Sequence, residues 1–200
     1  VHATQVAPAQ GTACAIPAMM EWMLLASGRA TIAPPVQARS LRITGWEAMG
    51  LALHRLGYRF GVVSTLGKTD LLNTILKHVR RRLGLTVFDQ KGCAPELVSA
   101  LQSGQHVSIF IEVPCRVRGM SLSFLGGMVE RSTAVNRLAK LTNSPCIFVF
   151  NRRTKTGMYQ INAERVPTDM QPLQWCHNRL EGLVRSAPSQ WVWLLDKPRG

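Results

Sequence analysis

The feature that most constrains the fold is an alternation of short apolar runs with longer amphipathic stretches. The clearest run is His106 to Glu112 (HVSIFIE), which is typical of a buried central strand. Similar runs predict further strands at 59–64, 85–88, 146–150 and 158–166. Strands that alternate with helices usually form one sheet with helices on both faces. The sequence therefore predicts an α/β domain with a central, mostly parallel or mixed sheet flanked by helices.

The stretches between these runs carry helical periodicity. They predict helices at 46–57, 71–83, 94–102, 132–142 and 169–186. In the second helix, apolar residues recur at helical spacing, at Leu72, Ile75, Leu76 and Val79. Gly84 stands where a glycine commonly ends a helix. Each strand after the first is thus preceded by a helix or a short loop.

The N-terminal part has a different character. Residues 1–41 are predicted to form an irregular arm with one short helix at Glu21 to Ser27, and 42–200 to form the α/β domain. Pro34 and Pro35 favour a loop over 30–41, because a proline cannot donate a backbone hydrogen bond. Val1 is not an initiator residue, so we expect that a leader or an upstream part has been removed.

The charge balance indicates an acidic partner. The chain has 24 Lys and Arg against 11 Asp and Glu, a net charge of +13 over 200 residues. Such an excess favours RNA, an anionic membrane surface or an acidic protein, although a basic solvated surface is the alternative. The five cysteines form no C-x-x-C pair, which argues against a zinc site and a disulfide framework. We expect free thiols, a reducing compartment, and neither metal nor cofactor.

Positive charge gathers at three places. The candidate anion-binding residues are Arg80, Arg81, Arg82, Arg116, Arg152 and Lys155. They could hold phosphates of RNA or of lipid headgroups, or an acidic helix of a protein. The alternative is ordinary solvated ends, since a helix C-terminus favours positive charge in any case. Aromatic residues make up only 6% of the chain, so RNA binding would rest on backbone phosphate and shape.

Several separated blocks point to one family. The blocks are Arg42 to Glu47 (RITGWE), Leu97 to Glu112, Arg118 to Gly126, Ala134 to Arg153, and Pro188 to Trp193 (PSQWVW). Over roughly 43–193 the chain resembles the bacterial lipid A biosynthesis acyltransferases, the lauroyl and myristoyl transferases of the lysophospholipid acyltransferase superfamily. The first block is similar to the family's His-x-Gly-Asn-Trp-Glu, and the last to its Pro-Glu-Gln-Trp-x-Trp. The resemblance implies a lysophospholipid-acyltransferase-like fold.

The resemblance also implies a chemistry that this chain has altered. In the family a histidine takes the proton of a lipid hydroxyl, a nearby carboxylate orients it, and acyl carrier protein is the donor. Here Glu47 keeps the carboxylate, but Arg42 occupies the histidine position. A guanidinium cannot accept a proton at neutral pH, and losing a general base typically costs about 10²–10⁴ in rate. We expect Arg42 to form an ion pair with Glu47 instead.

The remaining candidates follow from the same resemblance. A vestigial substrate site is expected at Glu112, Arg118, Gly119 and Arg153, with Glu112 where the family has aspartate. None of the five histidines has an acid five residues later, so each is interpreted as satisfied or solvent-facing rather than as a replacement base. They are His2, His54, His78, His106 and His177.

Two hypotheses follow, with a third behind them. The first is a catalytically inactive acyltransferase-like protein in a large acidic, RNA-containing complex, such as a mitochondrial ribosome or its assembly intermediate in the matrix, with acyl carrier protein as a possible neighbour. The alternative is an active acyltransferase on a lipid A precursor or lysophospholipid, at the cytoplasmic face of a bacterial inner membrane. A third is a protein that binds lipid or acyl chains without turnover.

Overall fold

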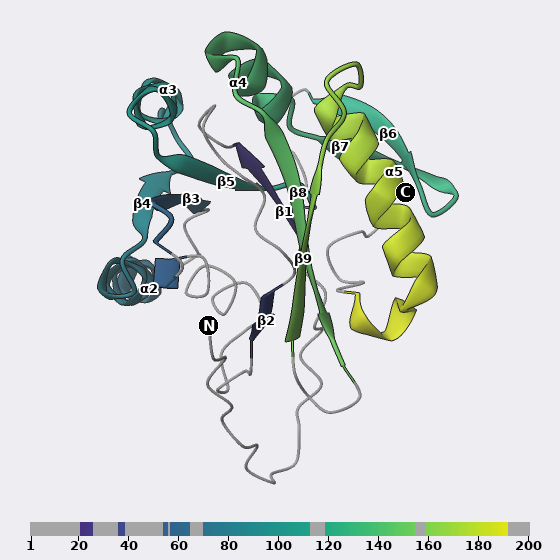
Figure 1. Cartoon of the computed structure of the whole chain (residues 1–200), viewed down its shortest axis with the longest axis horizontal. Helices are drawn as coiled ribbons and strands as arrows, with labels where there is room; N and C mark the ends of the chain where they lie inside the picture. The colour runs from purple at the N-terminus through teal and green to yellow at the C-terminus, as the bar shows by residue number, and fades with distance from the viewer. Residues whose placement is uncertain are drawn as a thin grey trace, which may run out of the picture.

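The computed structural model describes residues 21–25, 36–38, 54–55, 57–64, 70–112, 119–154 and 159–191. Seven strands form the main sheet in the order β2-β9-β8-β1-β5-β3-β4, and two more form a separate hairpin (Figure 1). The main-sheet strands are β1 (Glu21–Leu25), β2 (Val36–Ala38), β3 (Phe60–Ser64), β4 (Thr86–Asp89), β5 (His106–Phe110), β8 (Cys146–Arg153) and β9 (Tyr159–Arg165). The hairpin strands are β6 (Met120–Phe124) and β7 (Gly127–Arg131).

Four helices in the described residues agree with the sequence periodicity to within three residues at each end. They are α2 (Asp70–Arg82), α3 (Ala94–Gln102), α4 (Ala134–Thr142) and α5 (Pro172–Ser186), followed by a short 3-10 helix η1 (Pro188–Gln190). The helix predicted at 46–57 falls mostly outside the described residues, although His54 and Arg55 are helical.

The main sheet is mixed. β3 runs parallel to β4 and to β5, whereas β1 is antiparallel to both of its neighbours, β5 and β8. β9 is antiparallel to β8 and to β2. β5 and β8 therefore run in the same direction on either side of β1. The predicted α/β fold with a mixed sheet is confirmed.

The short helix predicted at Glu21 to Ser27 is wrong. Glu21–Leu25 is the strand β1 at the centre of the sheet, where Trp22 lies opposite both Phe110 of β5 and Val149 of β8. A helix of about two turns has little stability of its own, whereas a strand between two partners gains two ladders of hydrogen bonds. The loop predicted over 30–41 likewise contains a strand, β2, which pairs with β9.

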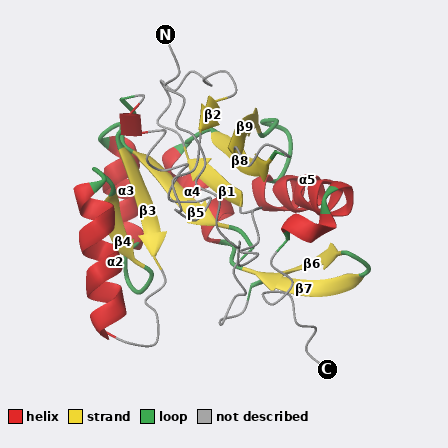
Figure 2. Ribbon diagram, turned by 90° about the horizontal axis from the view of Figure 1, so that it is seen from below, coloured by secondary structure: helices red, strands yellow, loops and turns green. Residues whose placement is uncertain are grey.

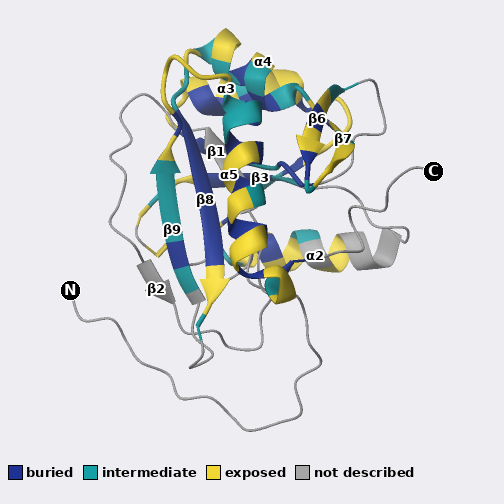
Figure 3. Cartoon of the chain, turned by 90° about the vertical axis from the view of Figure 1, so that its right-hand side faces the viewer, coloured by how far each residue is buried: buried dark blue, intermediate teal, exposed yellow. Residues whose placement is uncertain are grey.

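The crossovers place helices on both faces of the sheet. β4 and β5 lie on opposite sides of β3, so right-handed crossovers put α2 on one face and α3 on the other, as Figures 1 and 2 show. α4 contacts both α3 and α5, and these three helices form one layer. Figure 3 shows β8 buried under that layer while the outer sides of the helices are exposed.

The main hydrophobic core lies between the sheet and the layer of α3, α4 and α5. It takes alternate residues of β5 and β8, such as Val107 and Phe148, together with Leu180 of α5. The residues between them point to the other face of the sheet. Those are buried as well, but they stand outside the main cluster, and Ser108 and Asn151 are among them.

The hairpin of β6 and β7 was not predicted as such. Leu125 and Gly126 connect the strands with φ of 52° and 87°, the positive values that a tight two-residue hairpin turn needs. β6 contacts α5, and its Leu122 and Phe124 are buried. Two-residue hairpin turns usually have asparagine, aspartate or glycine before the final glycine, and this turn has leucine instead. The sequence therefore did not predict the hairpin.

The end of α2 is fixed by its backbone. The amide of Gly84 donates to the carbonyl of Arg81, and the amide of Leu85 donates to the carbonyl of Arg80, both at 3.0 Å. Gly84 has φ of +79°, and a Cβ there would lie 2.2 Å from the ring of His54. These are the bonds of a Schellman motif, as Gly84 predicted. The motif holds the C-terminal arginines of α2 in place.

Candidate functional site

The carboxyl ends of β3, β5 and β8 share one edge of the sheet, because the three strands run in the same direction. Ligands of open α/β sheets usually bind at this edge. Glu112 follows β5 here, and Asn151 lies near the end of β8. Each comes two residues after a partner of Trp22, Phe110 in one strand and Val149 in the other. The fold thus brings Glu112 and Asn151 to the same edge on either side of β1.

Both polar side chains are inside the protein. Glu112 is 1% exposed, and both of its carboxylate oxygens are buried. Asn151 is 0% exposed, and neither its Oδ1 nor its Nδ2 has a hydrogen-bond partner in the described part of the chain. Burying an amide without partners costs about 1–3 kcal/mol. Glu112 was predicted as a site residue, whereas Asn151 was missed because nothing in NRR marks it before the fold is known.

Gly119 lies where the chain passes very close to β7. A Cβ on Gly119 would stand 2.4 Å from the carbonyl oxygen of Arg131, so no other residue fits without a backbone shift. Arg131, at the end of β7, is 2% exposed. Its buried guanidinium was another residue that the sequence did not single out. The close approach of the two backbones explains why a glycine stands at position 119.

The end of β8 is held by the last described segment. The amide of Arg153 donates to Oε1 of Gln190 at 2.9 Å, and Nε2 of Gln190 donates to the carbonyl of Arg153 at 3.1 Å. The side-chain amide of Gln190 thus makes the pair of bonds that a neighbouring strand would make. The side chains of Arg152 and Arg153 are exposed. This contact gives the Pro-Ser-Gln-Trp block, whose Trp191 is buried, a structural reason.

The predicted arginines of α2 separate into two groups. Arg81 and Arg82 are exposed, but Arg80 is only 6% exposed, so it lies inside rather than at an anion-binding surface. Five further predicted site residues fall outside the described residues: Arg42, Glu47, Arg116, Arg118 and Lys155. The ion pair of Arg42 with Glu47 and the loss of the base consequently stay predictions.

The histidines differ in their surroundings. His54 and His78 are exposed, as expected. His106 is buried against Tyr58, and desolvation lowers its pKa. Desolvation, helped by the charge of Arg131, lowers the pKa of His177 to about 4.

His177 corrects the interpretation of buried histidines as satisfied. Its ring packs on Phe124 with centroids 4.9 Å apart, and neither ring nitrogen has a hydrogen-bond partner among the residues described. It is a neutral core residue, since an apolar environment disfavours the charged imidazole.

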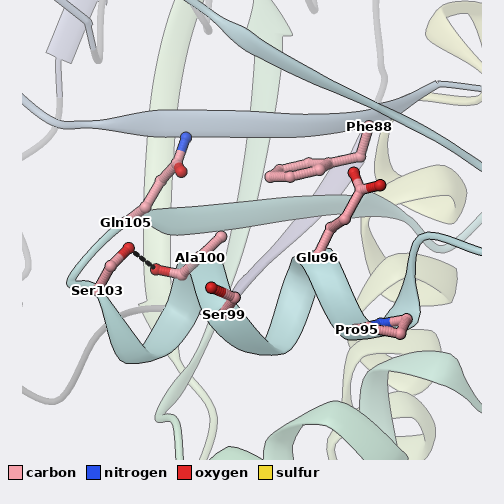
Figure 4. Close-up of a pocket in the computed structure, with 7 residues that line it drawn as sticks. All are labelled: Phe88, Pro95, Glu96, Ser99, Ala100, Ser103 and Gln105. Carbon is pink, nitrogen blue, oxygen red and sulfur yellow. Dashed lines mark hydrogen bonds between the residues drawn. The ribbon is translucent and has the colours of Figure 1, made fainter.

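A shallow depression of about 540 Å³ lies between α3 and the edge strand β4 (Figure 4). Phe88 and Gln105 border it from the sheet side, and Glu96, Ser99 and Ser103 from α3. Gln105 donates to Thr86 at 2.7 Å, and Ser103 donates to the carbonyl of Ala100 at 2.8 Å, so both already have local partners. Glu112 does not line this depression.

No helix in the part of the chain that the structure describes combines the length and the apolar character needed to cross a membrane. Within the same ranges, His, Cys, Asp and Glu side chains form no group of three that could hold a metal ion.

Comparison with known families agrees with the motif blocks. The family model described as bacterial lipid A biosynthesis acyltransferase matches residues 43–199. The chain belongs to this family. No curated protein matches it. The matched range contains Glu47, Glu112 and Gly119, but it begins one residue after Arg42, so the match leaves the replaced histidine untested.

Proposed function

We propose that this chain is a catalytically inactive member of the lipid A acyltransferase family that serves as a structural or assembly component of a large acidic, RNA-containing complex. A mitochondrial ribosome or its assembly intermediate, in the matrix, is the setting that suits a strongly basic chain with free thiols. Three of the five cysteines, Cys93, Cys146 and Cys176, are buried thiols that form no disulfide. Acyl carrier protein is a further candidate partner, because it is the family's acyl donor.

The observation that carries the proposal is Arg42 at the position of the family's histidine. An arginine keeps its proton at neutral pH, so it cannot remove one from a hydroxyl. The described histidines offer no replacement at the carboxyl edge: His177 is a buried core residue, and His54 lies against Gly84 at the end of α2. The net charge of +13 supports the second half of the proposal, the acidic assembly.

Sedimentation of the native protein from a gentle lysate, with and without ribonuclease, tests the assembly role. We expect the chain to migrate in a large particle that ribonuclease disrupts. Salt should release it as well, because phosphate contacts weaken with ionic strength. Recovery as a small species, or with membranes, would contradict the proposal.

The acyl-transfer assay tests the missing base. The wild-type chain should give background rates with an acyl carrier protein donor, and Arg42→His should raise the rate by about 10²-fold or more if the rest of the site is intact. Arg42→Lys is the matched control, since a lysine is also protonated at neutral pH, and it should stay at background. If the wild-type chain has robust activity and Glu47→Ala abolishes it, the proposal that the chain is catalytically inactive is wrong.

The alternative is an active acyltransferase at a membrane surface, and one observation favours it. Glu47 is retained in sequence, and Glu112 is held buried beside the carboxyl edge of the sheet, where a site of this fold class lies. In that case Arg42 has a role of its own, and Arg42→His should lower activity rather than raise it. The direction of this one change separates the two candidates.

A further inference from the structure

The outward side of α2 exposes two apolar side chains that a soluble helix normally buries. Ile75 is 50% exposed and Val79 is 43% exposed, and they stand one helical turn apart. Their spacing in the sequence suggested the buried stripe of an amphipathic helix. Among the exposed large hydrophobic residues that the structure describes, these two alone share one helix at i, i+4 spacing. They therefore form one continuous apolar strip, whereas the other exposed hydrophobic residues in the described ranges stand singly.

The inward side of α2 is instead partly polar. Arg80 is 6% exposed, and Lys77 forms an ion pair with Asp89 of β4 at 2.7 Å. At 100° per residue, positions 77 and 80 lie on the side of the helix opposite 75 and 79. The orientation of α2 is therefore set by contacts with the sheet, which leaves Ile75 and Val79 facing away from it.

Basic residues lie along one flank of the apolar strip. At about 100° per residue, Arg82 lies beside Ile75, His78 lies next on that flank, and Arg81 lies farther round the helix; all three are exposed. The Schellman motif at Gly84 fixes the end of the helix from which the arginines project. The surface thus combines a small apolar strip with positive charge along one of its flanks.

This combination selects among acidic partners. RNA would use the arginines, but its phosphates gain nothing from Ile75 and Val79. A bilayer interface calls for larger apolar side chains, such as Trp, Phe and Leu, over a wider face. An acidic amphipathic helix fits both features, because its apolar side chains pack on the strip and its carboxylates meet the arginines.

We propose that the outward surface of α2, formed by Ile75, His78, Val79, Arg81 and Arg82, docks an acidic amphipathic helix of a partner protein. The inference rests on the proposed assembly role and deepens it, since it names the surface and the chemistry of one partner. The other double arginine, Arg152 and Arg153, carries the same charge at the end of β8 but has no such apolar strip in the described residues.

Calorimetric titration of the whole chain with synthetic helical peptides tests the docking surface. One 18-residue peptide carries leucines on one face and glutamates beside them, and a second has lysines in place of the glutamates. The wild-type chain should bind the first and not the second. Arg81→Glu with Arg82→Glu should weaken binding about tenfold or more, because two attractive contacts become repulsive. Arg137→Glu with Lys140→Glu, at two exposed positions of α4, makes the same change in net charge and should alter binding by less than about twofold.

A second pair of variants tests the apolar strip. Val79→Asp should weaken binding of the acidic peptide, whereas Leu141→Asp on α4, at a leucine that is 70% exposed, should not. Urea unfolding of each variant shows that the fold is kept. Three results would each overturn the proposal. The wild-type chain could fail to bind the acidic peptide, or the two charge-reversal pairs could weaken binding equally. The third is a Val79→Asp effect confined to poly(U) or phosphatidylglycerol vesicles.

Sedimentation of the Arg81→Glu, Arg82→Glu chain separates this inference from the assembly role. We expect the variant to leave the large particle while the Arg137→Glu, Lys140→Glu chain stays. If the variant remains bound, the docking surface is wrong and the assembly role survives. If the wild-type chain is not found in a large particle, the assembly role is wrong. The peptide titration is then the test of the docking surface.

Discussion

The two faces of β5 and β8 are both buried, but they bury different kinds of side chain. Toward α3, α4 and α5 the strands present Val107, Phe148 and Phe150, which belong to one hydrophobic cluster. Toward the other face, Ser108 and Asn151 are interleaved with apolar residues, and each is 0% exposed. Neither has a side-chain hydrogen-bond partner among the described residues.

This difference shows where the stability of the domain comes from. Burying hydrocarbon stabilises the fold by roughly 25 cal/mol per Å², whereas a buried polar group without a partner costs about 1–3 kcal/mol. The helix side therefore holds the domain together, and the opposite side carries polar groups that stability alone does not favour. Truncating an apolar side chain of the helix side should consequently lower stability, whereas replacing an unpartnered polar side chain of the opposite side should raise it.

Phe148→Ala should have the largest effect. Phe148 is 0% exposed and contacts the rings of Phe150 and Trp175. Its truncation should lower the free energy of unfolding by about 3–5 kcal/mol, since it removes buried surface and leaves a cavity. Urea titration followed by tryptophan fluorescence measures this. A loss below about 1 kcal/mol would break the contrast between the faces.

His177 is the polar exception on the helix side, and its effect depends on pH. Its pKa in the folded state is about 4 against an ordinary value of 6.5. As the pH falls from 6.5 to 4, the unfolded chain binds a proton that the folded chain refuses, so stability falls by roughly 3 kcal/mol in all. His177→Leu should flatten this part of the stability curve.

Unfolding curves at pH 7.5, 6, 5 and 4.5 check the effect of His177. The buried His106, whose pKa is also lowered, should leave a residual slope in the variant. Leu180→Met, at a neighbouring buried position without a titrating group, should shift the whole curve and keep the wild-type slope. A His177→Leu chain with an unchanged slope would show that the imidazole is solvated or paired.

Asn151→Leu should act in the opposite direction from Phe148→Ala. Replacing an unpartnered buried amide by a side chain of similar size should raise the free energy of unfolding by about 2 kcal/mol. Val149→Ala, on the same face of β8, is the control and should lower it, which shows that the region is packed. If Asn151→Leu destabilises the protein, its amide has a partner in solution, and the carboxyl edge binds something there.

Ser108→Ala should have the smallest effect. Removing a buried hydroxyl that has no hydrogen bond should raise stability by about 1 kcal/mol, because the change in volume is small. Ser99→Ala, at an exposed position of α3, should stay within about 0.5 kcal/mol of the wild type. Thermal unfolding resolves the difference. If Ser108→Ala and Ser99→Ala change the stability equally, burial of the Ser108 hydroxyl does not contribute to the difference between the two faces.

Local patterns predicted the local parts of the fold. α3 begins and ends where its periodicity does, and the Schellman motif followed from Gly84. β1 was missed because its two partners lie about 85 and 125 residues further along the chain, and no local pattern reports such pairing. The burial of Arg80 was not predicted for a related reason. Packing against the sheet, rather than the sequence of α2 itself, decides which side of the helix is buried.

The candidate site was predicted only in part. Family blocks singled out Glu112 and Gly119, and the structure gives each a distinct environment, one buried carboxylate and one close backbone contact. Asn151 and Arg131 were not foreseen, because burial of a polar side chain is a property of the assembled sheet. The ion pair of Arg42 and Glu47 remains a prediction, since both lie outside the described residues.

The position of β1 has a consequence for the order of folding. β1 is synthesised well before both strands that flank it, β5 and β8, and β8 ends only at Arg153. The main sheet cannot close until Arg153 has been made, so this apolar segment lacks its partners until then. Pairing over such separations folds slowly and exposes the chain to aggregation. Release of the chain before residue 153 should leave β1 without its partner β8. The exposed apolar strand should then be a substrate for chaperones.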